Sequence, residues 1–219
     1  YGDHRDLHSF PTRRSSDLTH DCPRLLTCFA NKGKYKYHVN PYENPQCITG
    51  RPDEETWKRV RLYLAHQFTL PGSPSIWNGD EMGMWGSDDP DNRKPLWWPG
   101  MQFDPETRTN LQPGPKSYDS VGFDSSHFDY IKNLIRLRKE NPALVNGDIR
   151  FIPSPPQILV YARTLDQTTL TVILNASSLE QEYTPDMDFS GTDINDQTVY
   201  SSGKMILPPL SFKILKTTN

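Results

Sequence analysis

Three groups of residues carry side chains that could bind or act on a sugar. The first is the pair His20 and Asp21, and the second is the run Gly79-Asp80-Glu81. The third is "DDPDNRKPLWW", residues 88–98, which contains Asp89, Arg93 and two tryptophans. Carboxylates and guanidinium groups hold paired hydroxyls through directional hydrogen bonds, and an indole packs on the apolar side of a pyranose ring. Phosphate would require a Gly-rich turn and more basic residues, which the sequence lacks.

Each group taken alone also has a structural interpretation. A His-Asp pair frequently serves packing, and Gly79-Asp80-Glu81 can form a turn. The aspartates of 88–91 suit a solvated loop or a weak cation site, and Trp97-Trp98 suits packing. Their order in the sequence favours a functional role over a structural one, because the first group precedes a helix and the second follows the next strand. In a parallel α/β barrel these two places lie on the face that holds the active site.

The elements expected around these groups follow from periodicity. Asp53 can cap a helix with Trp57, Val60, Leu64 and Phe68 on one face, which Pro71-Gly72 ends. "SPSIW", residues 73–77, is predicted to be a short buried strand, so helix and strand form the αβ half of an α/β unit.

A long polar loop from about 80 to 122 separates this unit from a second helix. Ser126 is the predicted cap of that helix, and Asn141-Pro142 closes it. Its predicted apolar face contains Phe128, Ile131, Leu134 and Ile135. After Asn146, short β-branched runs between polar turns predict a small antiparallel domain. These runs are "DIRFI", "QILVYAR", "TLTVILN", "KMILP" and "SFKILK".

Composition excludes several classes of partner. The chain has 219 residues and a net charge of -3, so it offers no basic field for nucleic acid. It has no apolar run of about 18 residues, so no membrane partner is expected. Its three cysteines are irregularly spaced, which favours reduced thiols over a disulfide framework or a zinc site.

The first eighteen residues, "YGDHRDLHSFPTRRSSDL", have no helical or strand period. They resemble a conceptual translation of a common sequencing adapter. We therefore expect 1–18 to be a non-native tail, with the protein's own sequence starting near Thr19.

The segments "THDCPRLL", "LAHQFTLPGSPSIWNGDEMGMWGSDDPDNRKPLWW" and "LIRLRKENPAL" occur in this order. Together they resemble the C-terminal part of the α-amylase family of glycoside hydrolases, closest to its cyclomaltodextrinase and neopullulanase branch. The resemblance implies an α/β fold, with the C-terminal fragment of a TIM (β/α)8 barrel over 19–146. A small antiparallel all-β sandwich domain would follow over 147–219. Cys22 and Trp77-Asn78 depart from residues common in the family, which leaves fine substrate preference open.

The resemblance also assigns roles to single residues. Asp21 would stabilise the transition state by holding sugar hydroxyls, and His20 would hydrogen-bond the same sugar. Asp89 and Arg93 would grip the next sugar on the donor side. Asp80 and Glu81 would support the barrel mouth.

Retaining members of the family use a nucleophilic Asp and an acid Glu after barrel strands four and five. Both would lie upstream of Thr19, so the parent is predicted to hydrolyse α-1,4-linked glucans while the fragment is expected to be inactive. Substrates would be maltodextrin, cyclodextrin, pullulan or starch oligosaccharides. One alternative is a 4-α-glucanotransferase of the same family, and another is a non-catalytic carbohydrate-binding protein.

No cofactor is required by the sequence, and no metal ligand is assigned. The resemblance leaves calcium open, because some relatives bind it, and it leaves a homodimeric parent open, because others dimerise. The bacterial cytoplasm or periplasm is the expected compartment.

Overall fold

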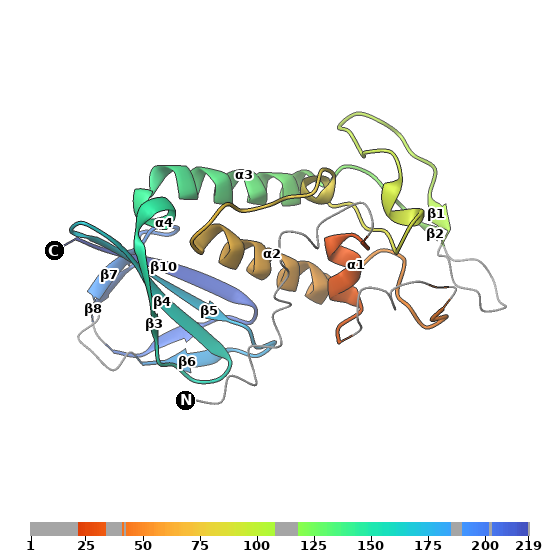
Figure 1. Ribbon diagram of the computed structural model, residues 1–219. Coiled ribbons are helices and arrows are strands. Elements are labelled where there is room, and N and C mark those ends of the chain that lie inside the picture. Colours follow the sequence, from red (N-terminus) through yellow and green to blue (C-terminus); the bar gives the residue numbers. More distant parts are fainter. Residues whose placement is uncertain are drawn as a thin grey trace. The chain divides into compact units, whose positions relative to one another are not determined.

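The computed structural model of the chain describes residues 22–33, 41, 43–107, 118–184, 190–201 and 203–218. The chain forms two compact units. Of the described residues, the first unit, here the sheet unit, comprises those of 61–74 and 133–218, and the second, the loop unit, comprises those of 22–60 and 75–132. Figure 1 draws the elements of both units along the chain. No helix in the described ranges combines the length and apolar character needed to cross a membrane.

The first long helix, α2 (Glu54–Thr69), confirms the periodicity of the sequence. Asp53 is its cap, because Asp53 Oδ1 accepts a hydrogen bond of 2.8 Å from the N–H of Thr56. The apolar side chains predicted to share one face are all buried, namely Trp57, Val60, Leu64 and Phe68. A cap and a stripe at three- and four-residue spacing are sufficient to define this helix.

The second long helix, α3 (Ser125–Glu140), begins one residue after a different cap from the predicted one. Asp124 Oδ1, and not the Ser126 hydroxyl, accepts the N–H of His127 at 2.9 Å. The helix ends before Asn141, as predicted, and Pro142 opens the short α4 (Pro142–Asn146). The other helices among the described residues are α1 (Leu25–Ala30) and two 3-10 turns, η4 (Asp80–Met82) and η5 (Asp91–Arg93).

The strand predicted at residues 73–77 does not form. These residues form no strand, and most of them are half-buried. A strand is defined by hydrogen bonds to a neighbour, and no described segment pairs with residues 73–77. The apolar pattern "SPSIW" therefore marks an extended segment whose strand character depends on a partner.

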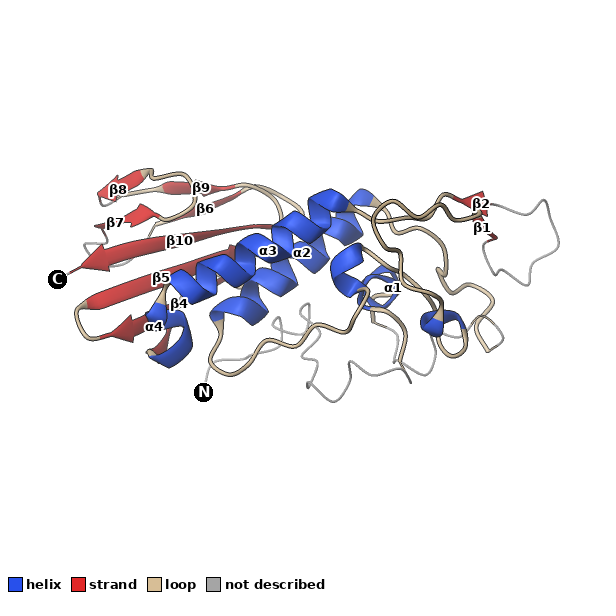
Figure 2. Ribbon diagram, turned by 90° about the horizontal axis from the view of Figure 1, so that it is seen from above, coloured by secondary structure: helices blue, strands red, loops and turns tan. Residues whose placement is uncertain are grey.

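The five antiparallel strands predicted after Asn146 are confirmed. Four of them, β3, β4, β5 and β10, lie with the unpredicted β7 and β8 in a six-stranded sheet of order β3-β4-β5-β10-β7-β8, and the fifth is β9. The long strands β4, β5 and β10 lie next to one another in both views (Figures 1 and 2). Two further pairs are β6 with β9 and β1 with β2. The strand bounds are Asp148–Ile152 (β3), Ile158–Leu165 (β4), Thr168–Asn175 (β5), Ser190–Asp193 (β7), Val199–Ser201 (β8), Ser211–Thr218 (β10), Gln181–Tyr183 (β6), Met205–Leu207 (β9), Glu106–Thr107 (β1) and Tyr118–Asp119 (β2).

Apolar side chains cover both faces of the central strands. On one face, Leu170, Val172 and Leu174 of β5 pack with Leu62 of α2 and Leu144 of α4. On the other face, Ile173 of β5 packs with residues of β6 and β9, including Tyr183 and Leu207. This two-sided burial explains why most residues of β4 and β5 are buried and do not alternate between buried and exposed.

Two arginines satisfy the main-chain carbonyls at the end of α2. Arg163 of β4 is fully buried, and its guanidinium donates to the carbonyls of Thr69 (2.6 Å), Leu144 (2.9 Å) and Gly147 (2.9 Å). Arg138 of α3 donates to the carbonyls of Phe68 (2.7 Å), Leu70 (3.0 Å) and Gly72 (2.5 Å). The last carbonyls of a helix lack intrahelical partners, so these bonds join α2 to the sheet and to α3.

Replacing Arg163 by Met removes the donors for three buried carbonyls. We expect a loss of about 3 kcal/mol in the free energy of unfolding, because unsatisfied buried acceptors are costly. Arg150→Met on the neighbouring strand β3 is the matched control, since Arg150 is exposed and pairs opposite Ala162. Urea unfolding of both variants measures the difference. Equal losses in the two variants would contradict the proposed role of the bonds.

The surroundings of His66 indicate that the stability of the sheet unit depends on pH. Its Nδ1 lies 3.2 Å from the Tyr161 hydroxyl, which also lies 2.5 Å from Thr69 Oγ1. Burial lowers the pKa of His66 to about 4. Between pH 6.5 and 4 the unfolded chain binds a proton that the folded chain does not, so stability decreases as the pH decreases through this window.

For the His66→Gln variant, we expect this part of the pH dependence to disappear. The wild type should lose about 3 kcal/mol more than the variant between pH 7 and pH 4, given a shift of the size above. Urea midpoints at the two pH values provide the measurement. A variant with the same slope as the wild type would show that His66 is not the titrating group.

Candidate functional site

Arg24 lies at the centre of the loop unit. Its side chain is buried, and its Nε donates to the carbonyl of Asn92 at 3.0 Å. Its Nη1 donates to the carbonyl of Asn78 at 2.7 Å and lies 3.5 Å from Asp80 Oδ1. The guanidinium carbon is 3.7 Å from the centre of the Trp77 ring. One side chain thus connects the segment after His20 and Asp21 with two other stretches.

The pKa of Arg24 is affected in opposite directions by burial and by two nearby carboxylates. Burial lowers the pKa of the Arg24 guanidinium, while the negative charges of Asp80 and Glu81 act in the opposite direction. Asp80 is itself buried. A buried arginine is tolerated when a carboxylate and good acceptors surround it, and here two carbonyls and an indole face complete the set.

The turn at Gly79 sets the positions of Asp80 and Glu81. Gly79 has φ 98°, a value that glycine adopts without strain. Its N–H donates to Glu81 Oε2 at 2.8 Å, and the N–H of Asp80 donates to the carbonyl of Trp77 at 2.9 Å. The two carboxylates therefore have different surroundings, since Asp80 contacts Arg24 while Glu81 closes the turn.

The loop that contains Asp89 and Arg93 is anchored by the residues between them. Asp91 Oδ2 accepts two hydrogen bonds from Ser87, one from its N–H at 2.6 Å and one from its hydroxyl at 3.1 Å. Asn92 is fully buried, and its Nδ2 donates to the carbonyl of Cys22 at 2.7 Å. The loop is therefore hydrogen-bonded to the residue that follows Asp21 in the chain.

Asp89 and Arg93 themselves face outward. Their side chains form an ion pair, with Arg93 Nε 2.9 Å from Asp89 Oδ1. The side chain of Arg93 is 43% exposed and that of Asp89 is 48% exposed. A pair with this exposure contributes little to stability. Its hydrogen-bonding capacity toward solvent is what would be available to a ligand.

His20 and Asp21 lie outside the described residues, so the distance from Asp21 to Arg93 is not among the observed contacts. Of the two tryptophans after the loop, Trp98 is exposed, whereas Trp97 is buried against Trp85 with ring centres 4.6 Å apart. Trp97 is therefore part of the packing, and Trp98 is the indole that faces solvent.

Arg24 and Asn92 are the residues that sequence reasoning missed. Neither belongs to a periodic pattern, and their partners lie 54 to 70 residues away. An arginine directly followed by the buried apolar pair Leu25 and Leu26 was a weak signal. Within the described ranges, no group of three His, Cys, Asp or Glu side chains could hold a metal ion.

Comparison with protein families identifies the class. The family described as "Alpha amylase, catalytic domain" matches residues 17–147, more than half of the chain. The chain belongs to the α-amylase family, as its three sequence segments indicated.

Relatives in the family fall in the expected branch. A cyclomaltodextrinase of Geobacillus thermopakistaniensis (strain MAS1) is 29% identical over 192 residues, which cover 84% of this chain and 25% of that protein. Neopullulanase 2 of Thermoactinomyces vulgaris is 33% identical over 119 residues, covering 53% of this chain and 17% of that protein. The chain thus spans about a quarter or less of the length of these two relatives.

Solved structures agree with the fold. A maltogenic amylase from S. marinus has a TM-score of 0.58 at 24% identity. The match covers 91% of this chain and 22% of the chain of that amylase. An α-amylase from Anoxybacillus has a TM-score of 0.59 at 22% identity, with 77% of this chain and 33% of that chain covered. At these identities the likeness concerns the fold alone.

Gly79 provides a direct test of the turn. A Cβ at this position would lie 2.5 Å from Met84 Sδ and 2.9 Å from Arg24 Nη1. For Gly79→Ala we expect a loss of about 3 kcal/mol or more in the free energy of unfolding, from backbone strain together with the clash.

The matched control is Gly100→Ala. Gly100 also has a positive φ, of 80°, but a Cβ there would meet nothing within 4 Å. This control should lose only about 1 to 2 kcal/mol, the backbone term alone. Urea unfolding compares the two variants, and equal losses would mean that the contacts around Gly79 are not tight.

Proposed function

We propose that the full-length protein containing this chain is a retaining glycoside hydrolase that acts on α-1,4-linked glucans. Membership of the α-amylase family supports the reaction class. Its relatives include proteins named cyclomaltodextrinase, maltogenic α-amylase and neopullulanase, which supports a glucan substrate.

The observation that carries the proposal is the hydrogen bond from Asn92 Nδ2 to the Cys22 carbonyl. Cys22 follows Asp21 in the chain, and Asn92 precedes Arg93. The bond thus joins the backbone carbonyl next to Asp21 to the side chain of the residue before Arg93. This supports a single sugar-binding region that takes one ring at His20 and Asp21 and the next at Asp89 and Arg93.

In this proposal Asp21 stabilises the transition state. Its carboxylate accepts hydrogen bonds from the hydroxyls at C2 and C3 of the reacting sugar, and these bonds tighten as the ring flattens toward the oxocarbenium ion. His20 donates to the same sugar. Preorganised interactions of this kind contribute about 3 kcal/mol each to lowering the barrier.

Asp89 and Arg93 recognise the neighbouring ring in the same proposal. The carboxylate accepts from one hydroxyl and the guanidinium donates to another, which holds the ring in one orientation. Asp80 and Glu81 support the site without touching the sugar, consistent with the ion pair of Asp80 with Arg24 and the contact of Glu81 with the Gly79 N–H.

The proposal includes a domain assignment. Residues 1–18 are a non-native tail, 19–146 form the C-terminal part of a catalytic (β/α)8 barrel, and 147–219 form a β-sandwich domain. The packing of β6 and β9 on one face of the six-stranded sheet supports the sandwich.

The test is hydrolysis by the full-length protein. We expect it to release reducing ends from maltotriose and from cyclodextrin, and Asp21→Asn to lower kcat about 100- to 1000-fold with a smaller effect on KM. Asp104→Asn is the control, because Asp104 is exposed and has no role in the proposal. Absence of hydrolysis by the wild type, or an Asp21→Asn variant with unchanged kcat, would refute the proposal.

A further inference from the structure

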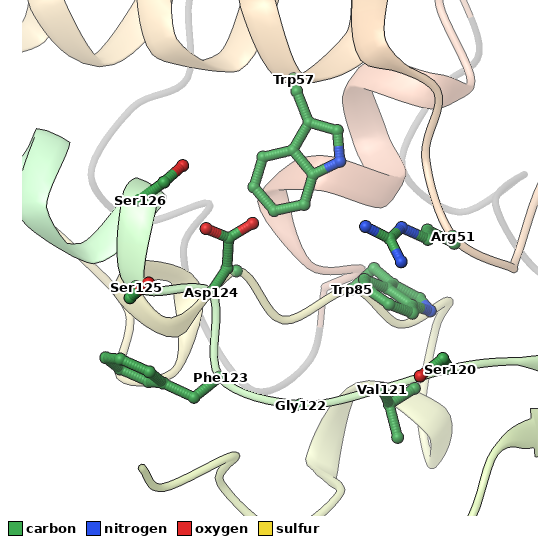
Figure 3. A pocket seen from close by; sticks show the side chains of 11 residues that line it. Arg51, Trp57, Trp85, Ser120, Val121, Gly122, Phe123, Asp124, Ser125 and Ser126 are labelled. Atoms are coloured by element: carbon green, nitrogen blue, oxygen red, sulfur yellow. The ribbon is translucent and has the colours of Figure 1, made fainter.

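The loop unit contains a pocket whose described lining includes neither Asp89 nor Arg93. It is a pocket of about 340 Å³, lined in part by Arg51, Trp57, Trp85 and Asp124. This volume lies at the lower end of the range for small-molecule sites. Figure 3 shows these four side chains around one space, with Phe123 turned away from it.

The polar groups of the pocket are held in place but keep bonding capacity. The N–H of Arg51 donates to Asp119 Oδ2 at 2.9 Å, which fixes its backbone. No hydrogen bond or ion pair engages the Arg51 guanidinium anywhere in the described part of the chain. Asp124 uses Oδ1 to cap α3, and its N–H donates to the Met82 carbonyl at 3.0 Å. The guanidinium of Arg51, on an anchored backbone, and the carboxylate of Asp124 thus both line the pocket.

The apolar walls are equally fixed. Trp57 and Trp85 are 6% and 4% exposed. Trp57 packs edge-on against His127 with ring centres 5.1 Å apart, and Trp85 packs edge-on against Trp97. Indoles held in this way lose little freedom when a ligand contacts them, so the pocket is preorganised.

The charges of the pocket select the class of ligand. A phosphate or other anion would meet the Asp124 carboxylate, and a cation would meet the Arg51 guanidinium. A neutral polyhydroxylated ring can accept from Arg51, donate to Asp124 and place its C–H face against an indole. The hydroxyls of Ser125 and Ser126, which also line the pocket, can donate or accept.

We propose that this pocket is a second saccharide site, which binds one glucosyl unit of an α-glucan chain. The choice of a glucan over other sugars rests on the proposed function, whereas the choice of a neutral sugar rests on the pocket alone. Asp89 and Arg93, the members of the proposed sugar-binding set that the structure describes, do not line it.

The experiment uses the full-length protein and two variants, Arg51→Gln and Asp124→Asn. Asparagine caps helices as well as aspartate does, so the second variant keeps the start of α3. Arg150→Gln, at an exposed position of β3, is the matched control. Electrophoresis through gels containing increasing amylose measures binding without requiring turnover, and hydrolysis of maltotriose is followed separately.

We expect each pocket variant to bind amylose about tenfold more weakly, the effect of losing one hydrogen bond to a charged group. The control should match the wild type, and all variants should hydrolyse maltotriose at the wild-type rate. Crystals soaked in maltotriose should show a sugar ring beside Trp57 and Arg51. Amylose binding that is unchanged in both pocket variants would overturn the inference. Crystals in which inorganic phosphate, and not a sugar ring, occupies the pocket would also overturn it.

The outcomes separate this inference from the proposed function. If the wild type binds amylose through this pocket but hydrolyses nothing, the proposed function fails and the saccharide site remains. If hydrolysis proceeds while the variants bind amylose normally, the second site fails and the proposed function remains.

Discussion

The side chain of Arg24 is buried among stretches that lie 54 and 68 residues further along the chain. Removing a guanidinium from water costs several kcal/mol unless its charge and its donors are matched. The carboxylate of Asp80, the carbonyls of Asn78 and Asn92 and the ring of Trp77 provide that match. The charge and the donors of the guanidinium are matched only when these groups come together. Arg24 therefore links the turn at Gly79 to the loop of 86–93.

The same physical solution recurs in the sheet unit. Arg138 and Arg163 donate to main-chain carbonyls around the end of α2, where the helical hydrogen bonds stop. Carbonyls in turns and at helix ends lack ladder partners, and the planar fork of arginine can reach several at once. In both units a buried arginine thus replaces the regular hydrogen bonding that a helix or sheet would otherwise provide.

Much of the regular structure could be predicted, because it depends on neighbours in sequence. The cap and apolar stripe of α2 and the β-branched runs of β4 and β5 are local signals, and the structure confirms them. The strand at 73–77 failed because pairing requires a neighbour that periodicity cannot reveal. Ser126 was a plausible cap by type, but Asp124 is the residue whose carboxylate accepts the N–H of His127 in the first turn of α3.

The candidate site was predictable in its exposed residues and not in its anchors. Asp89 and Arg93 carry a charge pattern that is visible in the sequence, whereas the partner of Asn92 is a carbonyl 70 residues away. A side chain that bonds to distant backbone leaves no trace in composition or period. Long-range bonds of this kind therefore had to come from the structure.

In the loop "DPDNR", residues 89–93, some side chains anchor the backbone and others face solvent. Asp91 and Asn92 turn inward and bond to Ser87 and Cys22, so the backbone is fixed by residues that a ligand would not touch. Asp89 and Arg93 turn outward four residues apart and form an ion pair with each other. The pair holds the two groups in one orientation at little energetic cost, because both remain near water. Under the proposed function, a sugar that takes up their hydrogen bonds would replace a weak exposed contact, and the loop beneath would keep its geometry.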